Sequence, residues 1–297
     1  MARGRLLLIG GGMLAILVVA LVLSLGTDGG APSAGVDLAE AANRTIRAGG
    51  AEIQTQTKLT PQGPIGASHA LTMPGKGFVD SSGEHMVLDM DMSALKKAAG
   101  KEVDLEGAEN VRAAYDYPVM YMRWPALASR IEFGKSWIKI DYSKILGEAG
   151  VDMSLFDAEN YNPSQQLRFL RAAGGKVERL GDEDIRGMHT VHYKGEVDIR
   201  RYPDLVPPAE RAQARRSAEK LTKLTGDPVD PVEVWIGDDG LVRRMRTSWD
   251  QEVGKMTATR EETIDYVSFG KRFAIKPPPK KDTVDLTRYV LEGKAGG

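Results

Sequence analysis

The longest uninterrupted run of apolar residues lies near the start of the chain, from Leu6 to Leu25, and contains no charged side chain. A helix of about 20 apolar residues spans the hydrocarbon core of a membrane. Arg3 and Arg5 precede the run and Asp28 follows it. Because basic residues stay on the cytoplasmic side, the rest of the chain is predicted to lie outside the cytoplasm.

Two interpretations of this first segment, residues 1–26, stay open. An uncleaved membrane anchor is favoured, because the apolar core of a cleaved signal peptide is usually shorter, about 7–15 residues. Small residues at Ser24 and Gly26 would nevertheless suit a signal peptidase. Residues 27–36 are mainly Gly, Pro, Ser and Ala, which predicts a flexible tether. Either way, the domain that follows is expected in the cell envelope or secreted.

Alternation of apolar and polar positions dominates residues 37–290 and predicts many antiparallel strands. Residues 86–92 are the clearest case, because apolar side chains alternate there with mostly acidic ones. Asp239–Gly240 is a strong two-residue hairpin turn. The expected strands are 51–60, 65–73, 86–92, 115–124, 136–141, a pair ending near 199 that flanks an acidic turn at 181–184, 231–237, 241–249 and 256–267. Gly75–Lys76–Gly77 is expected to be a turn.

The sequence contains fewer signals for helices than for strands. Asp37, with Glu40 three residues later, predicts an N-terminal cap for a helix that Gly49–Gly50 would end. Asn162–Pro163 predicts the start of a second helix, and residues 208–224 predict a third. No break in composition divides residues 37–290, so we expect one α+β domain followed by a short tail, residues 291–297.

Charge and composition exclude several classes of function. The formal net charge is −1, without the basic surplus of a nucleic-acid-binding protein. The chain has no cysteine and four histidines, and it contains no familiar catalytic motif, so we expect neither an enzyme, nor a metal site, nor a cofactor. His189 and His192 are predicted to lie on opposite faces of one strand, which is poor geometry for a shared metal.

Two groups of charged residues have alternative interpretations. The acidic residues at 182–184 and 238–239 carry carboxylates that would suit calcium, but ordinary acidic hairpin turns are the favoured interpretation. Arg243, Arg244 and Arg246 would suit anionic lipid headgroups, but a solvated strand face is favoured.

Methionine is concentrated on two of the alternating strands. It is unbranched and polarizable, so it suits surfaces that accept apolar ligands of variable shape, although it also fills gaps in ordinary cores. A curved sheet can enclose a cavity for a lipid-sized ligand. The alternation selects as candidate lining residues Met86, Leu88, Met90, Met92, Met120, Met122, Trp124, Val191, Tyr193, Val234 and Ile236, with Leu167 and Leu170 from a covering helix.

Several motifs in the same order resemble a known family: VMYMRWP, GKSWIKID, NPSQQLRFLRAAGG, GMHTVHYKGEVD and PVEVWIGDDGLVRRM. Together they are similar to the actinobacterial LolA-like envelope lipoproteins of the LprG/LppX type, over about residues 37–285. The resemblance implies a half-open barrel, in which a strongly curved antiparallel sheet wraps around a few helices and an apolar cavity. It also implies carriage of acylated lipids or glycolipids.

The sequence departs from that family at two points. The family's usual anchor is an acylated cysteine, which this chain lacks, so the Leu6–Leu25 segment would replace it. Gly237 stands where the family often has Asp. The sequence therefore predicts a membrane-tethered, extracytoplasmic protein that binds or transports a lipid or glycolipid without covalent chemistry. The alternative is an envelope sensor or interaction module of the same fold, which would bind a protein partner.

Overall fold

The computed structural model describes residues 40–41, 44–62, 70–80, 85–99, 109–116, 118–148, 177–204, 208–209, 211–225, 229–253, 256–273 and 276–291. The predicted anchor, the tether, the helix after Asn162–Pro163 and, apart from Leu291, the C-terminal tail lie outside these residues. Within the described part of the chain, no helix combines the length and hydropathy needed to cross a membrane.

The described strands form one twelve-stranded sheet, in the order β12-β6-β5-β4-β3-β2-β1-β11-β10-β9-β8-β7. All neighbours are antiparallel except β12 and β6, which pair in parallel. The strands are β1 (Gly50–Pro61), β2 (Leu71–Val79), β3 (His85–Asp91), β4 (Asn110–Asp116), β5 (Val119–Arg123), β6 (Trp137–Asp141), β7 (Glu178–Ile185), β8 (Met188–Asp198), β9 (Val229–Gly237), β10 (Val242–Val253), β11 (Met256–Lys271) and β12 (Thr283–Asp285).

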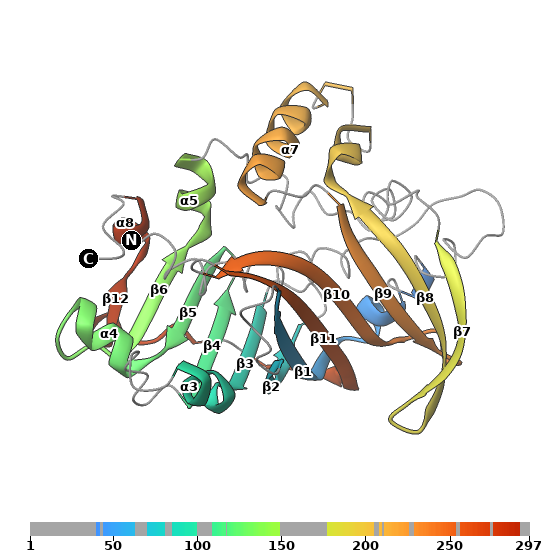
Figure 1. Ribbon diagram of the computed structural model, residues 1–297, viewed down its shortest axis with the longest axis horizontal. Helices are drawn as coiled ribbons and strands as arrows, with labels where there is room; N and C mark the ends of the chain where they lie inside the picture. The colour runs from blue at the N-terminus through green and yellow to red at the C-terminus, as the bar shows by residue number, and fades with distance from the viewer. Residues whose placement is uncertain are drawn as a thin grey trace.

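Two runs of consecutive strands, β1–β6 and β7–β11, make up most of this sheet. They meet where β1 pairs with β11, the first strand of one run beside the last strand of the other. In Figure 1, β10 and β11 curve across the middle of the view, between the β2–β6 side and the β7–β9 side. The pairing of β1 with β11 therefore makes one continuous sheet out of segments far apart in sequence.

The described helices are mostly short: α3 (Ser93–Ala99), α4 (Pro125–Ile131), α5 (Tyr142–Glu148), α7 (Arg211–Thr225), α8 (Thr287–Leu291) and the 3₁₀ turns η3 (Ile199–Asp204) and η4 (Lys280–Asp282). The helix predicted over 208–224 is confirmed as α7, which lies beside η3 above the ends of β8 and β9 (Figure 1).

Part of the first predicted helix is also described, since residues 40–41 and 44–47 are helical. Buried Thr45 joins it to the sheet, because its Oγ1 donates to the carbonyl of Ala41 and accepts the backbone N–H of Val242, at 2.7 and 2.9 Å.

Three predictions made from local pattern were wrong in detail. The single strand expected over 115–124 is a hairpin, in which Pro118 lies in the turn between β4 and β5. The acidic turn expected at 181–184 lies inside β7, and the turn falls at Arg186–Gly187, both with positive φ. Chain reversal needs left-handed backbone more than acidic side chains, and Gly187 supplies it.

The third correction concerns β2. This strand begins at Leu71, later than the start predicted at 65, and it contains the Gly75–Lys76–Gly77 segment that was expected to be a turn. A Cβ at Gly77 would overlap the carbonyl oxygen of Val87 on β3. The glycine therefore permits close approach of two strands rather than a reversal of the chain.

Candidate ligand-binding face

The two faces of the sheet differ sharply in chemistry. The inner face is defined here as the one bearing Met120, Ile138 and Met245, which are at most 1% exposed. One cluster of buried apolar residues covers this face from β6 to β8. The opposite, outer face bears ion pairs. The inner face is accordingly the place where an apolar ligand would be sheltered from water.

The sequence-predicted lining residues that the structure describes all belong to this one cluster. Eight of them are buried members: Met86, Leu88, Met120, Met122, Trp124, Tyr193, Val234 and Ile236. Met90, Met92 and Val191 are partly buried and pack against the cluster. Leu167 and Leu170 lie outside the described residues. The structure thus brings the described candidates together, while their role as the lining of a cavity stays a prediction.

The register shows how strands distant in sequence share the inner face. Directly opposed residues of antiparallel strands point to the same side of a sheet. One such line, the central row, crosses eight adjacent strands from β8 to β4. Its members are Tyr193, Val234, Met245, Ile264, Thr55, Gly75, Met90 and Val111. The inner face is therefore continuous across the junction of β1 with β11.

Sequence reasoning missed several members of the cluster, among them Ile53, Ala113, Met245, Ile264 and Tyr266. Burial raises the pKa of Tyr266, whose hydroxyl lies 3.9 Å from the sulfur of Met245. The spacing of Ile264 and Tyr266, two residues apart, indicates that they share one face of a strand. The pairing of β11 with β10 and β1 is needed to identify that face as the inner one.

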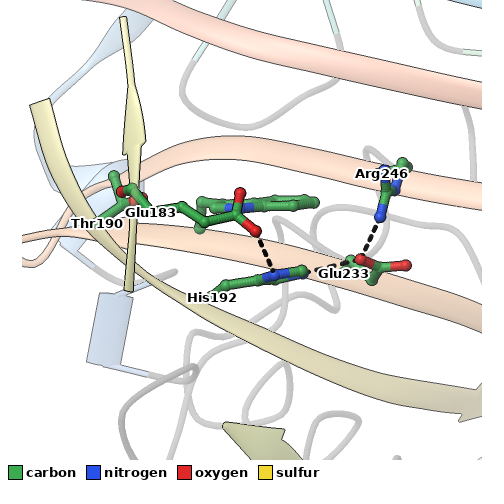
Figure 2. A network of polar contacts seen from close by, with 6 residues as sticks. Glu183, Thr190, His192, Glu233 and Arg246 are labelled. Atoms are coloured by element: carbon green, nitrogen blue, oxygen red, sulfur yellow. Dashed lines mark hydrogen bonds and ion pairs between the residues drawn. The ribbon is translucent and has the colours of Figure 1, made fainter. Parts of the chain in front are cut away.

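On the outer face, a polar network crosses four adjacent strands, as Figure 2 shows. His192 on β8 stacks on the ring of Trp235 on β9, with ring centroids 3.9 Å apart. Its Nδ1 lies 3.2 Å from Glu183 of β7 and its Nε2 lies 2.8 Å from Glu233 of β9. Arg246 of β10 pairs with the same Glu233, and the Trp235 indole donates to Glu183 at 2.8 Å. The network ties β7, β8, β9 and β10 together.

A second outer-face group joins the β7–β8 turn to the middle of the sheet. Asp265 on β11 accepts hydrogen bonds from Arg244 at 2.6 and 2.9 Å and from Arg186 at 3.0 Å. Burial raises the pKa of Asp265, but the two guanidinium groups outweigh burial and lower it below the usual value. Arg243 pairs separately with Asp239. The arginines predicted to form a simple solvated face are therefore ion-paired.

The described histidines have partners that suit structural ion pairing. His85 lies 2.6 Å from Asp80 and 3.2 Å from Asp116, and His189 lies 2.8 Å from Asp238. General-base catalysis needs a ring nitrogen that faces a nucleophile or a substrate. In His192 both ring nitrogens face carboxylates instead. Among the described residues there is also no group of three or more His, Asp or Glu side chains placed to hold a metal ion.

Comparison with known proteins places the chain near actinobacterial sequences. No family model matches it. An uncharacterized 31.2 kDa protein from the rplA–rplJ intergenic region of Streptomyces griseus is 28% identical over 204 residues, 68% of this chain and 63% of the relative. A putative lipoprotein of Streptomyces coelicolor is 24% identical over 160 residues, 53% of this chain and 45% of the relative. The matches thus span less than two thirds of either relative.

Three solved structures are similar in fold. LprF from Mycobacterium bovis has a TM-score of 0.39 at 15% identity, covering 84% of this chain and 99% of that one. The Mycobacterium tuberculosis lipoprotein LppX has a TM-score of 0.43 at 12% identity, covering 82% and 100%. A LolA superfamily protein from Nitrosomonas europaea has a TM-score of 0.27 at 7% identity, covering 84% and 97%. These matches include LppX and a LolA superfamily protein, the types that the sequence motifs resemble.

Proposed function

We propose that the protein binds lipids or other acylated ligands against the inner face of its sheet, outside the cytoplasm, and carries them without covalent chemistry. The single observation that supports this most is the continuity of the inner face, which runs across β1–β11 and joins the two runs of strands. A continuous apolar face of this kind suits the chemistry of an acyl chain.

The energetics of such binding are favourable. Burial of one methylene contributes about 0.8 kcal/mol, so ten methylenes give roughly 8 kcal/mol before the cost of ordering the chain. Methionines at 86, 90, 120 and 122 supply flexible side chains that adapt to ligands of different shape. In this proposal the sheet bends into a half-open barrel, and the cluster residues line the cavity that it encloses.

The proposed location follows from the N-terminal sequence and from the relatives. Leu6–Leu25 would hold the domain at the outer surface of the cytoplasmic membrane, in place of the acylated cysteine that this chain lacks. The related Streptomyces coelicolor protein is described as a putative lipoprotein, which fits the same compartment. A short tether over 27–36 would keep the ligand-binding face close to the bilayer, where acylated ligands reside.

The experiment that tests this function uses a lipid probe with a photoreactive diazirine in its acyl chain. Cells that produce the full chain with a C-terminal affinity tag are fed the probe, irradiated and lysed, and the labelled residues of the purified protein are mapped by mass spectrometry. We expect labels on inner-face residues such as Met120, Met122 and Ile138, and competition by unlabelled lipid.

Labelling restricted to the Leu6–Leu25 segment, or spread over outer-face residues without competition, would refute lipid carriage. If an unlabelled protein then co-purified with the tagged chain in a defined ratio, the interaction-module alternative would take its place. His192 serves as an internal control, because it lies on the outer face and is 6% exposed, so it should stay unlabelled although it is as buried as Met86.

A further inference from the structure

A row of polar side chains crosses the mostly apolar inner face, one step along the strands from the central row. We call it the polar row: Thr57 on β1, Glu262 on β11 and Thr247 on β10, which lie directly opposite one another in the ladder. Their exposed fractions are 5%, 4% and 3%. Buried Met73 on β2 and Val232 on β9 flank the row.

Glu262 is the centre of this row and has two partners. Thr57 donates to its Oε1 at 2.8 Å, and the Nε of Arg260 donates to its Oε2 at 2.9 Å. Arg260 lies two residues earlier on the same face and is placed over the ring of Trp249, 5.4 Å from the ring centroid. The carboxylate and the guanidinium thus form a buried pair with no net charge.

Thr247, in contrast, is buried, and within the part of the chain that the structure describes its Oγ1 has no hydrogen-bond partner. An unsatisfied buried hydroxyl destabilises the folded state, and valine has the same shape without this cost. A buried ion pair is likewise often replaceable by apolar residues without loss of stability. Apolar side chains at the positions of the polar row would therefore stabilise the fold about as well. The presence of polar side chains there points to a ligand.

We infer that the polar row recognises a neutral hydroxyl group on the ligand whose acyl chain lies along the central row. This inference rests on the proposed function. A hydroxyl both donates and accepts, so it can donate to Glu262 and accept from Thr247, satisfying the orphaned threonine. A carboxylate or a phosphate would bring negative charge against the Glu262 carboxylate, while Arg260 is already neutralised by it.

The position of the row fits this arrangement. Ile264 and Met245 of the central row each lie two residues from a polar-row member on the same strand. Residues two apart on a strand share a face and lie about 7 Å from each other. A ligand with its hydroxyl at Glu262 would therefore place the first methylenes of its chain on Ile264 and Met245, without bending back through the sheet.

The test compares diazirine-labelled probes that share one acyl chain and differ in their polar group: a monoacylglycerol, the free fatty acid and a lysophosphatidate. Each is cross-linked to the purified full chain over a range of concentrations. We expect half-maximal labelling at a concentration about tenfold lower for the monoacylglycerol than for the two anions. Equal half-maximal concentrations would overturn the inference but leave the proposed function standing, whereas no inner-face labelling by any probe would overturn both.

The decisive variant is Thr247→Val, because the inference predicts opposite changes in stability and in affinity. Its melting temperature should equal or exceed that of the unmodified protein, since the variant loses a buried, unsatisfied hydroxyl. Its affinity for the monoacylglycerol should fall roughly fivefold, the effect of one lost neutral hydrogen bond. The control is Thr263→Val, the same change on the outer face of β11 next to Glu262. Unchanged monoacylglycerol affinity in Thr247→Val would overturn the inference.

Glu262→Gln supplies a second, independent measurement. The substitution keeps the shape of the side chain but leaves the guanidinium of Arg260 without its counter-charge. We expect the preference to invert, so that the fatty acid labels at a lower concentration than the monoacylglycerol. Thermal melting first establishes whether the variant is folded. If it is folded and the ratio of the two half-maximal labelling concentrations stays as in the unmodified protein, recognition at Glu262 is contradicted. If it is not folded, Thr247→Val is the deciding variant.

Discussion

Substituting Ala113 by leucine tests whether space for a ligand lies above the β3–β4–β5 part of the inner face. Ala113 is 1% exposed and lies directly between Leu88 on β3 and Met122 on β5, which are 2% and 4% exposed. It is a small residue flanked by two large ones. Added side-chain volume at this position must either enter a ligand-accessible space or collide with neighbours.

The two cases predict opposite changes in the free energy of unfolding. If the space is open, the additional carbon atoms of leucine become sheltered and contribute about 2 kcal/mol at about 0.8 kcal/mol per methylene. If the interior is already filled, overpacking costs about 1–3 kcal/mol. In a domain of this size about 1 kcal/mol shifts the melting temperature by roughly 2–4 °C. If the proposed function holds, the melting temperature of the lipid-free protein should therefore not fall, and it should rise by up to about 4–8 °C.

The assay combines thermal melting of the delipidated full chain with diazirine labelling by the acyl probe. Ala113→Leu should keep or raise the melting temperature while lowering inner-face labelling, because the leucine occupies ligand volume. Ala113→Ser, which adds little volume, serves as a control for labelling. A melting temperature lower by several degrees, together with undiminished labelling, would refute the reasoning, since it would mean that the position is packed and that the ligand binds elsewhere.

Two further outcomes follow from the outer face and from β2. Because Arg244 and Arg186 lower the pKa of Asp265, its carboxylate stabilises the fold above the pKa of an unfolded aspartate, and this stability is lost as the pH falls through the lower, folded pKa. Asp265→Asn should therefore lower the free energy of unfolding by about 2 kcal/mol, as measured by chemical denaturation at pH 7. This difference from the unmodified protein should shrink as the pH falls. If there is no difference at pH 7, the pairing is contradicted. Gly77→Ala should lower the melting temperature and weaken hydrogen-exchange protection in β3, because its Cβ would overlap the carbonyl of Val87; an unchanged exchange pattern would contradict the close approach of these strands.

Local patterns in the sequence predicted the elements with short-range signals. Alternation over 86–92 identified β3, and Asp239–Gly240 located the turn between β9 and β10. These predictions succeeded because strand periodicity and turn chemistry are properties of a few neighbouring residues. The inner face of β3 and β5 was predictable for the same reason, since alternation alone separates the two sides of a strand.

Features that depend on strand pairing were not predictable in this way. The local sequence around Gly77 predicts a turn, and only the close approach of β3 shows why glycine is required there. The acidic residues of β7 resemble a turn in sequence until their partners on β8 and β9 are known, because Glu183 lies beside His192 and accepts a hydrogen bond from the Trp235 indole. Thr57, Thr247 and Glu262 come from three strands, and only the register shows that they meet.

The meeting of β1 with β11 has a consequence for how the protein forms. Gln56 opposes Thr263 in this ladder, so a pairing in the middle of the sheet joins the beginning of the described chain to nearly its end. Strands β1–β6 and β7–β11 each pair with sequence neighbours, which favours rapid local hairpin formation, whereas closing such a long loop slows the last step. The edge of β1 that pairs with β11 would therefore stay unpaired, after β1–β6 have formed their own ladders, until β11 has folded onto β10.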